Sequence, residues 1–245
     1  MWDWSKLSTR NYDETFPINF LTSVTFEVRF DPLLAIQQKV PTFQEKIRGK
    51  YPGLGKGVSF SIGLPFQESP ESIQWEFSTK DKTSHIRLSM DRLIFVTKEY
   101  KNYSEFRENY TFAFNEFTKT TKLQNFNRLG LRYINEIPLP HENNVIEYIL
   151  KRFNPIISRS RIEEDAPITF QTEYRVRHDE GLVTLRNNLS FEDGIPKYII
   201  DIDGYSVEVM TSNQIETISE KLHNLIVTEF HKNITDKFLE SLRGE

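Results

Sequence analysis

The sequence predicts an α+β fold in which antiparallel sheets are backed by helices, and three observations support this class. Several segments alternate apolar and polar residues with a period of two, which is typical of strands with one buried face. Other segments carry apolar residues at helical spacing. Aromatic residues make up 13% of the chain, and such side chains suit a pleated, half-buried surface.

Length and composition limit the remaining possibilities. A chain of 245 residues can form one large domain or two small ones and bury a core without a disulfide or metal. The net charge of −4 argues against a mainly electrostatic nucleic-acid binder. There is no cysteine, which excludes disulfides, thiol nucleophiles and cysteine-based zinc sites. With no secretory pattern at the N-terminus and no long apolar run, we expect a cytoplasmic protein without a membrane partner.

The first half predicts the order strand, helix, four strands, helix. Apolar residues alternate along residues 24–30, which indicates a strand with one buried face. Pro41 predicts that the first helix is bent or broken, and Ser104 is the expected N-cap of the second helix. The predicted segments are a lead-in at 1–22, a strand at 24–30, a helix at 33–51, a loop at 52–57, strands near 58–62, 73–77, 86–90 and 92–98, and a helix at 103–122.

The second half repeats much of this order, so we predict an internal duplication. The repeated unit is β-α-β(3-4)-α, and the predicted boundaries are 1–22 for the lead-in, 23–122 for the first repeat and 123–245 for the second. The predicted segments are a strand at 128–140, a helix at 143–153, a hairpin at 168–191 that turns at Asp179-Glu180-Gly181, a strand at 197–205 and one long helix from Ser212 to about Leu242. This order resembles the topology of TATA-binding-protein-like and helix-grip folds.

A period of two also assigns each strand residue to a face. In the central run RLGLRYINEIPLP, we expect Leu129, Leu131 and Tyr133 to point into the core and Gly130 and Arg132 to point to the open face. The same parity places charged residues of both signs on that open face. They are Arg29, Arg87, Arg132, Arg175, Arg177, Arg186, Glu27, Glu76, Glu173, Asp201 and Asp203.

This charged face has two interpretations. Opposite charges on neighbouring strands can form ion pairs on a solvated sheet, each worth roughly 0.2–1 kcal/mol. Alternatively the face binds a ligand, because the planar guanidinium of arginine suits phosphate and carboxylate groups. Every basic residue expected there is Arg and none is Lys. The candidate binding residues are Arg132, Arg175, Arg177, Asp201 and Asp203.

Three segments carry a resemblance to a known family. VTFEVRFDP near the start, LGLRYINEIPLP at the centre and YIIDIDGY near the end look like a sporadically distributed family of uncharacterised bacterial and archaeal proteins. The resemblance covers nearly the whole chain, and LGLRYIN is its most distinctive part. It implies no activity and no catalytic residues. Its scattered distribution implies horizontal exchange, which is common among defence and mobile-element genes.

Motifs for known chemistry are mostly missing from the sequence. The run GKYPGLGKGVS fails as a phosphate-binding loop, because its glycines have the wrong spacing and Gly57 follows Lys56 where Ser or Thr is required. Glu220 and His223 form a single Glu-x-x-His pair, whereas di-iron sites need two. We therefore predict no metal, no cofactor and no catalytic residue.

The predicted function is non-catalytic binding of a small anionic ligand or a protein segment on the open sheet face, within a bacterial defence or mobile-element system. One alternative is a metal-dependent enzyme acting on phosphodiesters, with Asp201 and Asp203 as its paired carboxylates. A second alternative is a saddle that binds nucleic acid, which the acidic net charge disfavours. The apolar stripe of the last helix could also pair with a second copy of the chain to form a homodimer.

Overall fold

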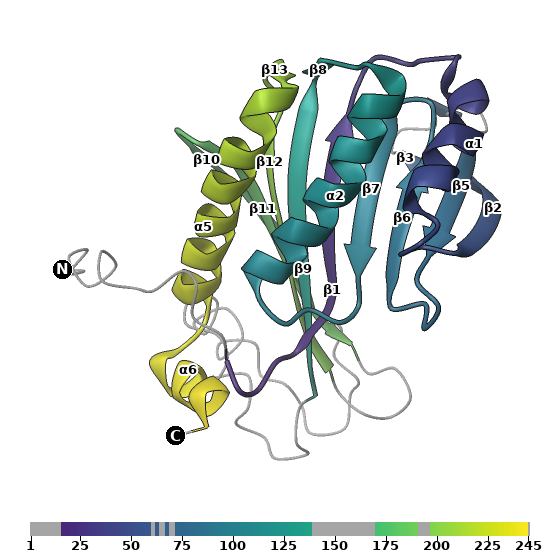
Figure 1. The fold of residues 1–245 in the computed structure, drawn as a ribbon. Helices are drawn as coiled ribbons and strands as arrows, with labels where there is room; N and C mark the ends of the chain where they lie inside the picture. Colours follow the sequence, from purple (N-terminus) through teal and green to yellow (C-terminus); the bar gives the residue numbers. More distant parts are fainter. Residues whose placement is uncertain are drawn as a thin grey trace. The chain divides into compact units, whose positions relative to one another are not determined.

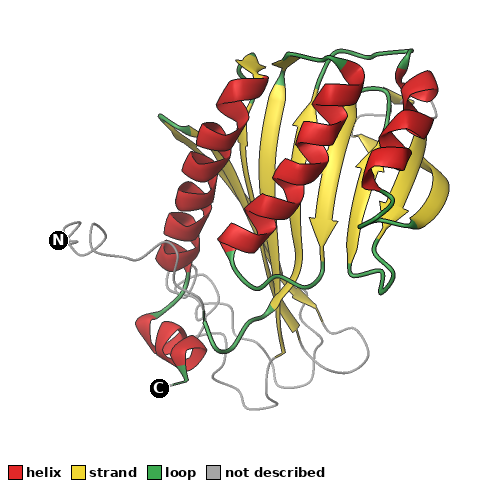
Figure 2. Ribbon diagram, in the orientation of Figure 1, coloured by secondary structure: helices red, strands yellow, loops and turns green. Residues whose placement is uncertain are grey.

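The computed structural model describes residues 16–59, 62–63, 67–68, 72–138, 170–190 and 197–244. The chain divides into two compact units, each built from segments that are distant in the sequence. Unit 1 comprises Met1–Thr22, Arg132–Gly204 and Glu220–Glu245, and unit 2 comprises Ser23–Leu131 and Tyr205–Ser219. Both combine helices with antiparallel strands, so the predicted α+β class is confirmed (Figure 2).

Unit 2 contains five strands in the order β1-β7-β6-β5-β2. Their bounds are Leu21–Arg29 for β1, Arg92–Thr97 for β7, Ser84–Leu88 for β6, Ser72–Ser78 for β5 and Gly53–Ser59 for β2. Each neighbouring pair with a described register is antiparallel. Two short pairs complete the strands, namely β3 (Ile62–Gly63) with β4 (Gln67–Glu68) and β8 (Asn125–Phe126) with β13 (Met210–Thr211).

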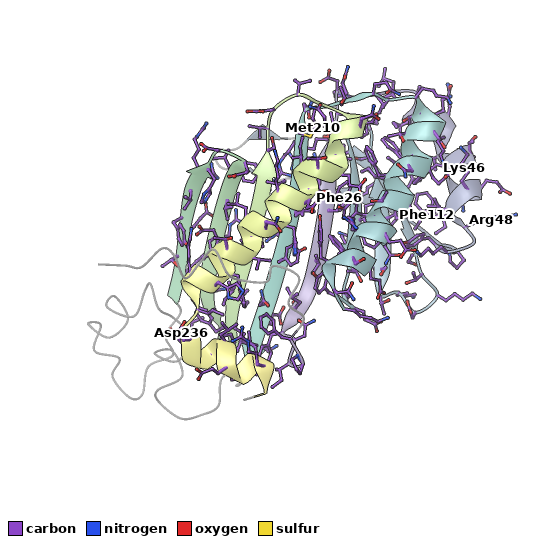
Figure 3. The ribbon with its side chains drawn as sticks, turned by 60° about the vertical axis from the view of Figure 1, so that its left-hand side comes forward. Phe26, Lys46, Arg48, Phe112, Met210 and Asp236 are labelled. Atoms are coloured by element: carbon purple, nitrogen blue, oxygen red, sulfur yellow. The ribbon has the colours of Figure 1, made fainter. Side chains whose placement is uncertain are left out.

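Two helices, α1 (Ile36–Ile47) and α2 (Tyr103–Thr121), cover one face of these strands (Figure 1). The strand residues that alternate toward the helices are fully buried, and most are aromatic or branched. Phe26 of β1 stacks on Tyr110 of α2 with ring centroids 4.2 Å apart. Figure 3 shows Lys46 and Arg48 on the outer side of α1, whereas Phe26 lies in the interior. The helices are therefore held by aromatic contacts with the buried strand face.

Unit 1 contains four strands in the order β10-β11-β12-β9. Their bounds are Phe170–His178 for β10, Gly181–Ser190 for β11, Lys197–Ser206 for β12 and Arg128–Pro138 for β9. Helix α5 (Ile215–Asn233) follows a short 3-10 helix, η3 (Ser212–Gln214), and α6 (Asp236–Arg243) ends the described chain. A Cβ atom on Gly204 of β12 would lie 2.8 Å from Ile226, so this glycine allows α5 to approach the strand closely.

Most predicted strands are confirmed, and so is the parity of the central run. Leu129, Leu131 and Tyr133 are buried and Arg132 is exposed. The hairpin between β10 and β11 turns at Asp179-Glu180 as predicted. Gly130 follows the same parity, because a Cβ atom on it would point toward the guanidinium group of Arg128, which lies on the same face and covers this glycine.

Three local predictions in the first half need correction. Helix α1 is not broken at Pro41, because Gln37 and Pro41 are exposed and water can reach the carbonyl group that loses its partner, while a bend at this residue stays a prediction. The N-cap of α2 is Asn102 rather than Ser104, since the Asn102 side chain accepts a hydrogen bond from the Glu105 amide at 2.8 Å. The glycine-rich segment expected as a loop is mostly strand β2, paired with β5.

The single long helix predicted after Ser212 is also wrong, because α5 ends at Asn233 and α6 starts at Asp236. The Asn233 side chain is fully buried and donates to the Asn187 side-chain oxygen at 3.2 Å. Thr235 then caps α6 by accepting a hydrogen bond from the Phe238 amide at 3.1 Å. A buried polar contact and a new N-cap therefore interrupt the helical pattern.

The predicted duplication and its boundaries stay a prediction, as does the likeness to TATA-binding-protein-like folds. The helix expected at 143–153, which would be the counterpart of α1, lies outside the described residues. Of the lead-in, the described part begins at Phe16. Phe20 stacks near Phe238 with ring centroids 6.2 Å apart, which ties this segment to α6 within unit 1.

We expect Phe26→Ala to lower the free energy of unfolding by about 3–5 kcal/mol, because it removes a fully buried ring that stacks on Tyr110. Chemical denaturation followed by circular dichroism measures this change. The matched control is Phe112→Ala, since Phe112 of α2 is only half-buried and its ring lies near Tyr51 rather than against a strand. Equal losses in the two variants would contradict the assignment of Phe26 to the core.

Candidate functional site

The open face of unit 1 carries a chain of ion pairs that starts at Arg132 of β9. The Arg132 guanidinium donates from Nε to Oδ1 and from Nη2 to Oδ2 of Asp201 on β12, with both distances 2.7 Å. This is the bidentate geometry in which arginine binds carboxylates most strongly. The Asp201 side chain is only 8% exposed, while that of Arg132 is 46% exposed. Its hydrogen bonds to Asp201 raise the pKa of Arg132 further above its ordinary value, and so this guanidinium group stays charged.

Arg186 of β11 extends this chain across the next two strands. Its Nη1 lies 3.3 Å from Oδ2 of Asp201, and its Nε donates to Glu173 of β10 at 2.7 Å. Partial burial lowers the pKa of Arg186, but hydrogen bonds and charge attraction from Glu173 and Asp201 outweigh burial, so the net pKa is raised. Arg132, Asp201, Arg186 and Glu173 together neutralise one another.

The other three predicted residues have different surroundings. Arg175 is exposed on β10 and donates from Nε to the Thr184 hydroxyl at 3.2 Å, without a carboxylate partner in the described part of unit 1. Arg177, two residues along β10, is exposed and makes no hydrogen bond or ion pair with any described residue. Asp203 is half-buried on β12, and its charge contributes to the raised pKa of Arg132.

All five predicted residues thus lie on strands of unit 1, but they do not form one site. Arg132 and Asp201 belong to the ion-pair chain and hold neighbouring strands together. Arg175 and Arg177 form a separate pair on β10, which we call the β10 arginine pair. Because these two guanidinium groups lack acidic partners among the described residues, they are the predicted residues that can bind an external anion.

The ion-pair chain bears on the metal-enzyme alternative. Both carboxylate oxygens of Asp201 accept hydrogen bonds from guanidinium groups, which leaves this side chain poorly placed to bind Mg²⁺ together with Asp203. Over residues 16–138, 170–190 and 197–244, apart from the gaps near residues 60–71, no three His, Cys, Asp or Glu side chains gather as metal ligands would.

The open face of unit 2 follows the same ion-pairing pattern. Glu76 of β5 accepts a hydrogen bond from Arg87 of β6 at 2.7 Å, directly across the strand pair. His85 approaches the same carboxylate at 3.3 Å. Arg29 pairs with Glu27 at 2.7 Å along β1. These outward residues therefore follow the first interpretation of the charged face, in which opposite charges form ion pairs on a solvated sheet.

A buried polar cluster on the opposite face of unit 1 was not predicted from the sequence. Glu229 of α5 is 1% exposed, and its carboxylate lies 2.8 Å from Lys232 and 3.5 Å from His178 of β10. His223, also buried, has its Nδ1 3.0 Å from the hydroxyl of Tyr133. Glu220 is exposed, so it does not join His223 in a metal site. Only the three-residue spacing of Glu229 and Lys232 could have suggested any of these contacts.

Neither a scan against protein-family models nor a search of curated proteins finds a match for this sequence. No helix in the described ranges is both long enough and apolar enough to cross a membrane.

We expect Arg132→Ala to lower the free energy of unfolding by about 1–3 kcal/mol, because it leaves the buried Asp201 carboxylate with only the longer contact to Arg186. Urea denaturation of the variant provides the measurement. Arg177→Ala is the control and should change stability by less than about 0.5 kcal/mol, since it breaks no contact with a described residue. Similar values for both variants would mean that the ion-pair chain has no structural role.

Proposed function

We propose that the protein is a non-catalytic binding protein that takes up an extended acidic segment of another protein along β10. The observation that carries this proposal is the β10 arginine pair. Its two guanidinium groups are exposed, have no acidic partner among the described residues, and lie on the strand at the end of the order β10-β11-β12-β9. Carboxylate groups are the natural partners of such guanidinium groups.

The backbone of β10 supports strand addition. Among the described strands, β10 has β11 as its only neighbour, so one of its edges presents main-chain N–H and C=O groups. An added segment can pair with these groups, as in other proteins that bind peptides at a sheet edge. Tyr174 and Val176 on the other face of β10 are only half-buried, which leaves apolar surface for the segment to cover.

The spacing of the arginine pair supports an acidic pattern in the segment. Arg175 and Arg177 are two residues apart, so both project from the same face of β10. Residues directly opposite on an added strand would lie about 4.5–5.5 Å away on that same face. A segment with acidic residues at alternate positions would therefore place one carboxylate near each guanidinium.

The other predicted functions have less support. A small anionic ligand uses the same guanidinium chemistry but does not use the strand edge. The phosphodiester enzyme requires free carboxylates, whereas Asp201 is held by Arg132 and Arg186. A nucleic-acid saddle requires a basic face, yet most outward arginines here pair with acids. The absence of cysteine supports a cytoplasmic location for the complex, and the family resemblance supports a setting in bacterial defence or mobile elements.

A displayed library of random linear peptides, selected against the purified protein, tests this proposal. We expect the wild type to enrich segments with Asp or Glu at alternate positions. The double variant Arg175→Glu with Arg177→Glu should instead enrich Lys or Arg at those positions, because the charge of the face is reversed. Fluorescence anisotropy of a selected acidic peptide should show a loss of affinity of about tenfold or more in the variant.

The control variant is Arg48→Glu, which changes one exposed arginine on α1 in unit 2 and should leave the selected sequences unchanged. Selection of the same peptides by wild type and the reversed variant would overturn the role of the arginine pair. Enrichment of no acidic pattern at all would overturn the proposed partner.

A further inference from the structure

Unit 2 contains a cavity of about 390 Å³, formed entirely by its own residues. Its lining residues come from the segment just after α1, the turn between β5 and β6, the end of β7 and the first turns of α2. Cavities of roughly 300–1,000 Å³ are usual for small-molecule sites. The cavity is separate from β10 and from the ion-pair chain, because none of its lining residues belongs to unit 1.

Tyr51 provides an unsatisfied polar group at this cavity. Its side chain is 1% exposed, yet its hydroxyl makes no hydrogen bond with any described residue. Burial raises the pKa of the Tyr51 phenol well above its ordinary value, so the hydroxyl stays protonated. The hydroxyl lies at the wall of the cavity, so a ligand there can form a hydrogen bond with it.

The charges around the cavity favour a cation. Four carboxylates line it, and they belong to Asp81, Glu99, Glu105 and Glu108, against the two amines of Lys50 and Lys101. Lys101 lies 3.4 Å from Glu105, while Lys50 donates to Asn109 and lies over the ring of Phe112. Asp81, Glu99 and Glu108 form no ion pair with a described residue. The lining thus has an excess of negative charge that an anionic ligand would increase.

The cavity also has an apolar, aromatic wall. Phe106, a buried residue of α2, and Tyr100 line it with ring centroids 6.0 Å apart. The hydroxyl groups in the lining already have partners within the protein. Thr79 donates to Asp81, Ser84 donates to the Thr97 hydroxyl, and Thr97 donates to the main-chain carbonyl of Glu99. A methylene chain can therefore lie against the rings while its charged end reaches the carboxylates.

We propose that this cavity binds a small aliphatic polyamine. One ammonium group donates a hydrogen bond to the Tyr51 hydroxyl oxygen, and the carboxylates of Glu99 and Glu108 balance the positive charges. The alkyl chain contacts Phe106 and Tyr100. The site is a second binding activity, independent of the acidic segment proposed for β10.

Isothermal titration calorimetry with spermidine as the probe tests this site on the full chain. We expect saturable one-site binding to the wild type. Tyr51→Phe removes only the hydroxyl and should weaken binding about tenfold or more, with a melting temperature equal to or above that of the wild type. Glu99→Gln and Glu108→Gln should each weaken binding several-fold, because each removes one unpaired carboxylate.

The matched control is Glu45→Gln, which removes the same charge from an exposed position on α1 outside the cavity and should leave the affinity unchanged. An equal loss in Glu45→Gln and Glu99→Gln would overturn the proposal, since binding would then reflect net charge alone. Unchanged affinity in Tyr51→Phe would also overturn it. Tighter binding of the neutral probe glucose than of spermidine would overturn the assigned ligand class.

Discussion

Burial of one face of the central strands, such as β1, beneath a helix is the constraint on which the rest of this structure depends. The alternation that places Phe26 against Tyr110 also places Glu27 and Arg29 on the opposite side. A slip of one residue in any strand would exchange the two sets and expose the aromatic core. The covered face therefore fixes the register, and the register fixes which charged side chains meet on the open face.

Once the register is fixed, it determines which charged side chains of the open face lie close enough to pair. A guanidinium group and a carboxylate on neighbouring strands can reach one another without any change of the backbone, as Arg87 reaches Glu76 and Arg132 reaches Asp201. Most of the outward arginines form such pairs. The arginines without an acidic partner among the described residues lie at the margin of this face, where a strand has fewer neighbours, as Arg177 of β10 does.

The sequence was sufficient to predict features that depend on local periodicity. Strand parity around Arg132, the turn at Asp179-Glu180 and the aromatic stripe of α2 all follow from spacing along one segment. It was insufficient where distant residues decide the outcome. The end of α5 at Asn233 depends on Asn187, and the strand at Gly53 depends on its fit against Ser78. The cavity at Tyr51 was not predicted, because four segments distant in the sequence build it.

The division of the chain into units has a consequence for how the protein is made. Unit 2 needs Tyr205–Ser219 and unit 1 needs Glu220–Glu245, so neither unit is complete until most of the chain has left the ribosome. Contacts between such distant segments are slow to form, because a long loop must close before they stabilise anything. Incomplete chains would expose apolar strand faces during synthesis, and such intermediates are the usual substrates of chaperones. The same interleaving means that cutting the chain at its midpoint would yield two fragments, neither of which holds a complete core.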